Sequence, residues 1–444
     1  MPAPLALALT PDPDPTTAEL VAARPHLSMH AMDGLLMEGV PLNAIADAVG
    51  SPTWVLSANC IRGRLRQLQD AMANLPLHIH YAVKANDHLA VLRLVAQAGA
   101  GADVVSGGEM QRALRAGIPA AHIVFSGVGK SVPELRHALQ SGIGQINAES
   151  AEELAMISAA AAGMAATARV ALRINPDVDA GTHAKITTGR ADNKFGVAYA
   201  DAAALYAHAA TLPGVQPVGI ALHIGSQIMS MTPYRAAYAR TADLVRALRA
   251  AGQTVDIVDC GGGLGIPYRN DPAATPAAFA GAIRAAFGGL DVRLAIEPGR
   301  WLVGPAGVLL SSVILSKTTS GRRFVVLDAA MNDLVRPAMY DAWHGIVPVS
   351  AAAAATAPMP ADIVGPVCES GDTFARNRLL PPLPPNARLA ILDAGAYASV
   401  MSSTYNSRPL AAAVMVDGHR WSVIRARQPI EALWEGESTP DWFG

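Results

Sequence analysis

Eight short, apolar and β-branched runs alternate with longer helical patterns between residues 78 and 300, and this alternation restricts the fold more than any other feature of the chain. Such an alternation is typical of parallel strands joined by helices. Eight strand-helix units in succession predict an α/β fold, a TIM-type (β/α)8 barrel. The expected strands span residues 78–84, 102–106, 123–127, 145–149, 168–175, 218–225, 255–263 and 293–300.

A second pattern begins near residue 310, where strand-like runs follow one another without regular helices between them. The last two runs predict a hairpin that turns at Asp417-Gly418. A strand at 54–58 precedes the barrel and is a candidate to pair with the later domain. The expected domains are a disordered or irregular leader at 1–30, a barrel at 54–310, and a C-terminal β-rich domain at 311–444 that also includes 31–53.

The charge balance bears on the class of partner. The chain has 444 residues with 34 basic and 36 acidic side chains, and neither sign forms a long run. This argues against nucleic-acid and membrane partners and favours a small-molecule substrate. The Ala-rich, uncharged stretch at residues 154–168 is shorter than the roughly 20 apolar residues of a membrane span. Cys60, Cys260 and Cys368 show no metal-ligand spacing, which fits a reducing, cytoplasmic compartment.

Polar residues stand where the predicted barrel strands end, and in a TIM barrel these ends carry the chemistry. Lys84 ends the first strand. An ordinary lysine at this point would extend its amine into solvent. A partly desolvated lysine would instead have a lowered pKa and could form a Schiff base with a carbonyl cofactor. Position alone leaves both interpretations open.

The seventh and eighth strands end in Gly261 to Gly263 and in Glu297-Pro298-Gly299-Arg300. A dinucleotide-binding motif is not favoured, because Pro267 follows closely and no helix opens where that motif requires one. Two adjacent glycine turns in a barrel indicate a phosphate site built from backbone N–H groups, with ordinary tight turns as the alternative.

His223 and Glu297 complete a set that suits a pyridine ring. A carboxylate beside the pyridine nitrogen keeps it protonated, so that the ring can accept electrons from the substrate. An imidazole can stack on the ring face. Taken singly, His223 is more simply a structural histidine and Glu297 a partner of Arg300. Together with Lys84 and the glycine turns, they predict a cofactor site at the barrel mouth.

A series of motifs runs through the chain in one order: YAVKAN, HIGSQI, CGGGLG, EPGRWLVG, DAAMNDLVRPAMYDAW, CESGDTF and DAGAYASVMSSTYNSRP. After about residue 30 this series resembles the fold-type III pyridoxal-phosphate decarboxylases, and among them the diaminopimelate decarboxylase family. The resemblance implies pyridoxal 5'-phosphate as cofactor. It also implies decarboxylation of meso-2,6-diaminopimelate to L-lysine and CO2, the last step of lysine biosynthesis.

The resemblance assigns roles to individual positions. Lys84 would bind the cofactor covalently, His223 would stack on its ring, and Glu297 would contact the pyridine nitrogen. Ser226 would assist the residues that hold the cofactor phosphate, namely Gly261, Gly262, Gly263, Gly299, Arg300 and Tyr397. The end of the substrate that does not react would be bound by Arg300, Arg336, Tyr340, Glu369 and Tyr397.

Cys368 would donate a proton to the substrate carbanion and would reach in from the partner subunit, an arrangement that implies a homodimer with a composite active site. Without the resemblance, Cys368 is more simply an inert cysteine, as most free cysteines are. The segment 176–197 is long for a connection between a strand and a helix. We expect it to cover the barrel mouth, with a plain surface insertion as the alternative.

Three rival functions fit parts of the pattern. A decarboxylase of the same fold could act on ornithine, arginine, carboxynorspermidine or a siderophore precursor, but the CESGD segment with Arg336 and Tyr340 favours a substrate that carries a second amino-acid head group. An alanine-racemase-like enzyme is disfavoured by Glu297, since the resemblance would place an arginine there. A non-catalytic relative is disfavoured because Lys84 and Cys368 are both present.

Overall fold

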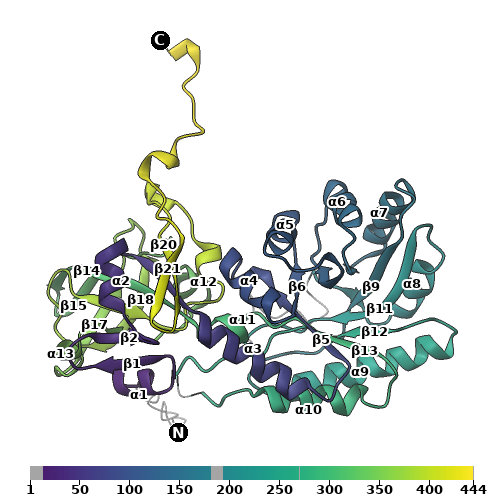
Figure 1. Ribbon diagram of the computed structural model, residues 1–444, viewed down its shortest axis with the longest axis horizontal. Helices are drawn as coiled ribbons and strands as arrows, with labels where there is room; N and C mark the ends of the chain where they lie inside the picture. Colours follow the sequence, from purple (N-terminus) through teal and green to yellow (C-terminus); the bar gives the residue numbers. More distant parts are fainter. Residues whose placement is uncertain (1–13, 182–193, 270, 444) are drawn as a thin grey trace, which may run out of the picture.

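The computed structural model describes residues 14–181, 194–269 and 271–443. Within these residues, a closed barrel of eight parallel strands lies beside a second β-sheet (Figure 1). The barrel strands are β5 (Leu77–Ala82), β6 (Gly101–Val104), β7 (Ile123–Phe125), β8 (Gln145–Ala148), β9 (Ala168–Asn175), β11 (Val215–Leu222), β12 (Ile257–Asp259) and β13 (Arg293–Ile296).

The strands pair in sequence order, and β13 pairs back onto β5 with Leu294 opposite Leu77. The predicted TIM-type barrel is therefore confirmed. A two-residue strand, β10 (Val197–Ala198), adds to β9. The helices around the barrel are α3 (Ala58–Met72), α4 (Leu89–Gln97), α5 (Gly107–Arg115), α6 (Val132–Ser141), α7 (Ala151–Ala162), α8 (Ala202–Ala209), α9 (Met231–Ala250), α10 (Pro276–Phe287) and α11 (Arg300–Val303).

Hydroxyl side chains fix where several of these helices begin. Ser106, Ser150, Ser230 and Thr275 are the N-caps of α5, α7, α9 and α10, and each accepts a hydrogen bond from a backbone N–H in the first turn. Such a cap stabilises a helix start by about 1 kcal/mol. The caps set the length of the connections after the strands, which are the segments that form the barrel mouth.

Helix α9 supports the glycine segment that follows β12. Tyr234 and Tyr238 on this helix are fully buried and pack against the ring of Phe279 from α10. Their hydroxyl groups donate to the carbonyl oxygens of Gly262 and Cys260, at 3.0 and 3.1 Å. The aromatic layer outside the barrel therefore fixes the backbone of a segment that faces the mouth.

The second sheet is centred on β14 (Gly307–Thr319), whose first half is buried and whose second half is exposed. Its pairings confirm the expected β-rich domain in the C-terminal part of the chain. The strands run in the order β18 (Thr373–Leu380), β17 (Met359–Val364), β15 (Arg322–Leu327), β14, β4 (Thr53–Ser57), β20 (Ala412–Asp417) and β21 (Arg420–Arg425), while β19 (Arg388–Ile391) pairs with β14 and with β16 (Ile346–Pro348).

The strand pairing tests two expectations, the hairpin at Asp417-Gly418 and the early strand at 54–58. The hairpin is confirmed, since Asp417 pairs with Arg420 across the turn. Strand β4 lies between β14 and β20, as its apolar sequence allowed. All five residues of β4 are buried. The expected barrel range of 54–310 included this strand, whereas the structure pairs it with the second sheet and begins the barrel sheet at β5.

The N-terminal residues differ from the expected irregular leader. From Thr17 onward the chain is ordered into α1 (Thr17–Ala22), β1 (Leu27–His30), β2 (Gly34–Met37), β3 (Val40–Pro41) and α2 (Leu42–Val49). Helix α1 begins with a capping box, in which the side chains of Thr16 and Glu19 each bond the other's backbone. Its buried Leu20 and Val21 pack on the second sheet. Prediction from the Pro- and Asp-rich start missed this cap and its apolar pair.

The remaining short helices lie in the second half of the chain, and after β21 the chain extends away from the body (Figure 1). They are α12 (Arg336–Tyr340), α13 (Ala351–Ala354), and the 3-10 segments η4 (Ser399–Met401), η5 (Tyr405–Ser407), η6 (Ile430–Leu433) and η7 (Asp441–Phe443). Among the described helices, none combines the length and apolar character needed to cross a bilayer. Most of the expected cover at 176–197 lies outside the described residues, which omit 182–193.

Candidate active site

Lys84 lies in a 3-10 segment, η1 (Val83–Ala85), directly after β5. Its Nζ donates a hydrogen bond to Oδ2 of Asp103 on the neighbouring strand β6, at 2.6 Å. Asp103 is fully buried, while the Lys84 side chain lines a cavity and is 35% exposed to it. Two further buried carboxyl groups, Asp259 at the end of β12 and Glu297 after β13, complete a cluster around the amine.

The carboxyl groups control the protonation of this cluster. Burial alone would lower the pKa of Lys84, but Asp103 and then Glu297 outweigh burial and hold the pKa above its usual value. The lowered pKa expected from desolvation is therefore wrong, because Asp103 faces the amine across the β5–β6 pair. Burial raises the pKa of Glu297 well above its usual value, and raises that of Asp259 to about 6. Burial thus favours the protonated form of the Glu297 carboxyl group.

Asp103→Asn removes the charge that raises the pKa of Lys84. We expect the pKa of the amine to fall by about one to three pH units, the effect of a nearby opposite charge. The rate at which the apoenzyme attaches pyridoxal phosphate, measured against pH, should show its midpoint at correspondingly lower pH. Asp87→Asn is the control, since Asp87 pairs with Arg112 at the surface. An unchanged midpoint in Asp103→Asn would contradict this role of Asp103.

His223 follows β11 and lines the same cavity as Lys84. Its Nδ1 accepts a hydrogen bond from the N–H of Gly262, at 3.2 Å. Burial, together with the positive charges of Arg173 and Lys84, lowers the pKa of His223 well below its usual value. His223 is therefore a neutral ring with Nδ1 unprotonated, and the Gly262 N–H fixes its orientation.

The glycine run after β12 is required by close packing. A Cβ on Gly261 would lie 2.2 Å from the carbonyl oxygen of Leu222, and one on Gly262 would lie 2.0 Å from that of Glu297. The N–H groups of Gly261 and Gly262 already donate to Asp259 Oδ1 and His223 Nδ1. In this arrangement they orient side chains of the site, and the phosphate-binding role stays a prediction for Gly263 and the Gly299-Arg300 backbone.

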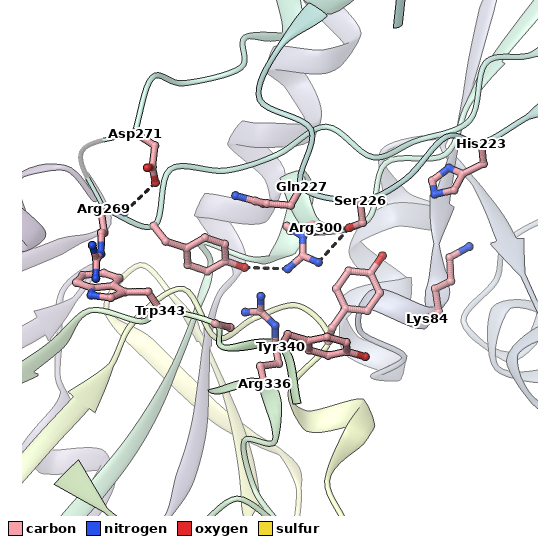
Figure 2. Close-up of a pocket in the computed structure, with 13 residues that line it drawn as sticks. Lys84, His223, Ser226, Gln227, Arg269, Asp271, Arg300, Arg336, Tyr340 and Trp343 are labelled. Carbon is pink, nitrogen blue, oxygen red and sulfur yellow. Dashed lines mark hydrogen bonds between the residues drawn. The ribbon is translucent and has the colours of Figure 1, made fainter. Parts of the chain in front are cut away.

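The cavity at the barrel mouth has a volume of about 520 Å³ and is shared by both domains. Figure 2 shows Lys84 and His223 at one end and Arg269 and Trp343 at the other. The predicted residues that the structure brings together around it are Lys84, His223, Ser226, Arg300, Arg336, Tyr340 and Tyr397. A smaller cavity of about 310 Å³ continues from Lys84 and His223 and includes Glu297.

Two buried guanidinium groups occupy the middle of the cavity. Arg300 donates to Tyr268 Oη at 2.9 Å and to Ser226 Oγ at 3.0 Å, and lies 4.8 Å from the ring centre of Tyr397 (Figure 2). Arg336 contacts Nε2 of His344 at 3.0 Å and the face of the Tyr268 ring. Both arginines are over 90% buried, and among the described residues neither forms an ion pair with an acidic side chain.

An unpaired buried guanidinium is costly, so two of them facing one cavity indicate an anionic ligand there. Burial lowers the pKa of Arg336 from its usual value, which reflects this cost. A carboxylate accepts two parallel N–H bonds from a guanidinium. The far end of the cavity is therefore suited to a carboxylate, at a distance from the amine of Lys84.

Sequence reasoning missed several residues that shape the site. Asp103 lies within β6 and Asp259 is the last residue of β12, but both fall inside the strands expected at 102–106 and 255–263, so a list of expected strand ends did not include them. Tyr268 and His344 carry no strand signal: Tyr268 stands in the connection after β12, and His344 follows α12 in the second domain. Their contact with the arginines is decided by how the two domains meet.

Two predicted residues lie apart from this cavity. Cys368 and Glu369 stand in an exposed loop between β17 and β18 of the second domain, and neither lines the cavity that contains Lys84. The backbone N–H of Cys368 donates to Asn406 Oδ1 at 3.1 Å. Within one chain the structure therefore does not join them to the other site residues, and their catalytic and binding roles stay predictions.

Asp14 holds the far wall of the cavity from the N-terminal segment. Its carboxylate accepts a hydrogen bond from Trp343 Nε1 at 3.1 Å and forms ion pairs with Arg269 at 3.2 Å and Arg378 at 2.9 Å. Arg378 also lies over the Trp343 ring, 4.4 Å from its centre. Since Arg269 and Trp343 line the cavity, a segment outside the barrel fixes the wall opposite Lys84.

Asp14→Asn keeps a hydrogen-bond acceptor for Trp343 but removes the charge that holds the two arginines. Losing a partly exposed ion pair costs about 1 kcal/mol. We expect KM to rise roughly three- to tenfold, with kcat nearly unchanged, because the wall is remote from the reacting end. Steady-state kinetics would measure this. Asp33→Asn, which removes an exposed pair with His30, is the control, and a fall in kcat alone would contradict the expectation.

Comparison with known proteins decides the family. Residues 58–304 match the family model described as "Pyridoxal-dependent decarboxylase, pyridoxal binding domain". A diaminopimelate decarboxylase of Zymomonas mobilis is 48% identical over 414 residues, which cover 92% of this chain and 98% of that protein. This chain belongs to the diaminopimelate decarboxylase family. The resemblance inferred from the motifs is confirmed.

Solved structures of the diaminopimelate decarboxylase family share the whole architecture. The enzyme from Helicobacter pylori, complexed with L-lysine, superposes with a TM-score of 0.86 at 39% identity and covers 89% of this chain and 99% of its own. The enzyme from M. jannaschii, also in complex with L-lysine, has a TM-score of 0.89 at 34% identity and covers 94% of this chain and 98% of its own. Barrel and β-domain are thus both features of the family.

Pyridoxal phosphate is the cofactor of the diaminopimelate decarboxylase family, and the barrel mouth fits it. Lys84 supplies an amine at the cavity, and Glu297 supplies a buried carboxyl group. A Cβ on Gly299 would lie 3.1 Å from the Tyr397 hydroxyl, so glycine keeps the space beside that hydroxyl open. The amine suits the aldehyde of pyridoxal phosphate, and the carboxyl group suits its pyridine nitrogen. The hydroxyl beside the open glycine backbone suits its phosphate.

Proposed function

We propose that this protein decarboxylates meso-2,6-diaminopimelate to L-lysine and CO2 with pyridoxal phosphate as cofactor, the last step of lysine biosynthesis. The observation that carries the proposal is the pair of buried guanidinium groups, Arg300 and Arg336, that face the same cavity as Lys84. Diaminopimelate has an amino-acid head group at each end. One can react at Lys84 while the carboxylate of the other neutralises the arginines.

Rival substrates fit these arginines less well. Ornithine, arginine and carboxynorspermidine have no carboxylate at the end that does not react, so they would leave both guanidinium groups buried without an anion. Such a mismatch of a buried polar site disfavours the wrong substrate strongly, often by several orders of magnitude. The relatives also support diaminopimelate as the substrate, since proteins named diaminopimelate decarboxylase match nearly all of this chain.

The residues of this chain divide the work along the cavity. Arg300, Arg336 and Tyr340 bind and orient the remote carboxylate, which places the reacting end against Lys84. The cofactor, when bound, supplies an aromatic ring that accepts electrons from the substrate. Glu297 would place its buried carboxyl group beside the ring nitrogen of the cofactor. His223, neutral and oriented by Gly262, offers its ring face, and the Lys84 amine, which donates a hydrogen bond to Asp103, exchanges a proton with the substrate.

We place the proton donor to the product carbon at Cys368, contributed by a second copy of the chain in a homodimer. The exposure of Cys368 and Glu369 on a loop of the β-domain supports this, because an exposed loop is free to enter another subunit's cavity. Cys368→Ala with normal cofactor content should lose most of its turnover. Mixing Cys368→Ala with a Lys84→Ala chain should restore part of it, since one site of the mixed dimer is then complete.

Carbon dioxide release tests the substrate. Purified, cofactor-loaded enzyme is offered meso-diaminopimelate, L-lysine, ornithine and arginine separately at equal concentration. Release from diaminopimelate alone, with lysine as product, supports the proposal; preferential release from another amino acid overturns the substrate while keeping the cofactor chemistry.

The cysteines, none of them in a disulfide in the described chain, support a reducing compartment, and we propose the cytoplasm as the location.

A further inference from the structure

A second cavity lies at the opposite end of the barrel from Lys84, where the strands begin. Its volume is about 870 Å³, and it is lined by residues at the start of β5, β7, β8, β9, β12 and β13. TIM-barrel enzymes carry their chemistry at the other face, and a cavity at this face is not needed for decarboxylation. We call it the basal cavity.

The lining of the basal cavity has one sign of charge. Arg169 at the start of β9 and Arg293 at the start of β13 contribute guanidinium groups, and three histidines contribute imidazoles. Among the residues that the structure describes, no aspartate or glutamate lines this cavity. The chain as a whole has slightly more acidic than basic side chains, so this segregation is a local feature. Clefts lined by one sign of charge concentrate ligands of the opposite sign.

The three histidines form a compact group. The His78 ring lies 4.8 Å from the ring of His80 and 4.7 Å from that of His122, between ring centres. His80 is 8% exposed, and its Nδ1 lies 3.2 Å from the carbonyl oxygen of His122, to which it donates. Nε2 of His78 is buried and lacks a hydrogen-bond partner among the described residues. A buried polar atom left without a partner is uncommon and indicates a missing ligand or water.

We propose that the basal cavity binds a multivalent oxyanion, in the size range from inorganic phosphate to a tricarboxylate. Arg169 and Arg293 supply permanent positive charge, and the imidazole N–H groups supply directed hydrogen bonds. The lining includes residues from both β5 and β13, the pair of strands that closes the barrel. A bound anion would therefore contact both strands at this end. Binding therefore stabilises the fold as well as neutralising the cavity.

Anion binding in the basal cavity should be accompanied by uptake of protons by the histidines. Burial, with the neighbouring His78, lowers the pKa of His80 to about 4, and burial also lowers the pKa of His78. These rings are therefore neutral near pH 7. An anion favours their charged form, as does Asp103 from inside the barrel, while Arg169 and Arg293 oppose it. Anion binding then takes up protons, so affinity rises as the pH falls.

Calorimetric titration of the holoenzyme with inorganic phosphate, and separately with citrate, tests the proposal at about pH 6.5 and pH 8. We expect a Kd of about 1 mM or tighter at the lower pH, several-fold weaker binding at the higher pH, and a raised melting temperature. Tighter phosphate binding identifies the ligand as a phosphate ester, and tighter citrate binding as a polycarboxylate; both support the site.

Variants separate the basal cavity from the substrate cavity. Arg169→Gln with Arg293→Gln should weaken binding by about tenfold or more, and His78→Gln should reduce the pH dependence of binding. Arg336→Gln is the matched variant at the substrate cavity, and the binding that depends on Arg169 and Arg293 should remain in it. Loss of binding in Arg336→Gln but not in the Arg169/Arg293 variant would overturn the proposal, as would the absence of binding by either anion in a holoenzyme of normal melting temperature.

Discussion

Replacing Lys84 by arginine is expected to lower turnover of diaminopimelate by about 10³-fold or more, since the role proposed for the amine is both to attach the cofactor and to transfer protons. Arginine keeps the positive charge opposite Asp103, so the buried carboxylate is not left alone and the fold is retained. The variant should show no cofactor absorbance that responds to borohydride. Turnover, absorbance and melting temperature measured on one preparation separate loss of chemistry from loss of structure.

Lys317→Arg is the control for this experiment, because Lys317 is exposed on β14, far from the barrel mouth. It should retain full turnover and cofactor content. Lys84→Ala extends the test by removing the charge as well. A Lys84→Ala protein that still shows borohydride-sensitive cofactor absorbance would contradict the assignment of Lys84.

Arg336→Gln is expected to lower kcat/KM for diaminopimelate by about 10²- to 10³-fold, roughly 3–4 kcal/mol, mainly through KM. The loss follows from removing a buried charge that binds the remote carboxylate. The free protein should be no less stable, because burying this guanidinium without an acidic partner costs free energy. Reduced activity with an unchanged or raised melting temperature would therefore distinguish a binding role from a structural one.

Arg336→Lys should recover only part of the loss, since a lysine ammonium cannot form two parallel bonds to a carboxylate. Arg246→Gln, at an exposed ion pair with Asp243, controls for loss of a surface charge. If the KM for diaminopimelate were unchanged in Arg336→Gln, other residues would have to bind the remote carboxylate. The substrate assignment would then lose its main structural support.

The barrel was predictable because its signal is local and repeats. Each strand is a short apolar run and each helix has an apolar stripe, so eight repeats specify the architecture without knowledge of any contact. The same reasoning placed Lys84 and His223 at strand ends, and the structure brings both to one cavity. The pairing of β4 with the later strands β14 and β20 was only a candidate, because partners over 200 residues apart share no local signal.

The chemistry of the site was less predictable than its location. The expected pKa of Lys84 was wrong in direction, because the charge of Asp103 acts across a strand pair. Asp14 reaches the substrate cavity from a segment expected to be irregular. Tyr268 and His344 meet the arginines only where the barrel and the β-domain adjoin.

The sequence by itself determined the barrel, the second β-rich domain and the positions of Lys84 and His223 at the barrel mouth, since periodicity and strand ends are read along the chain. Tertiary structure alone decided which charges lie next to each other. Within the described residues, it paired Lys84 with Asp103 and gave Arg300 and Arg336 no acidic partner. It also gathered three histidines with two arginines at the far end of the barrel. The physical reason is that electrostatic interactions depend on distance and burial in space, and these are set only when strands from distant parts of the chain close the barrel.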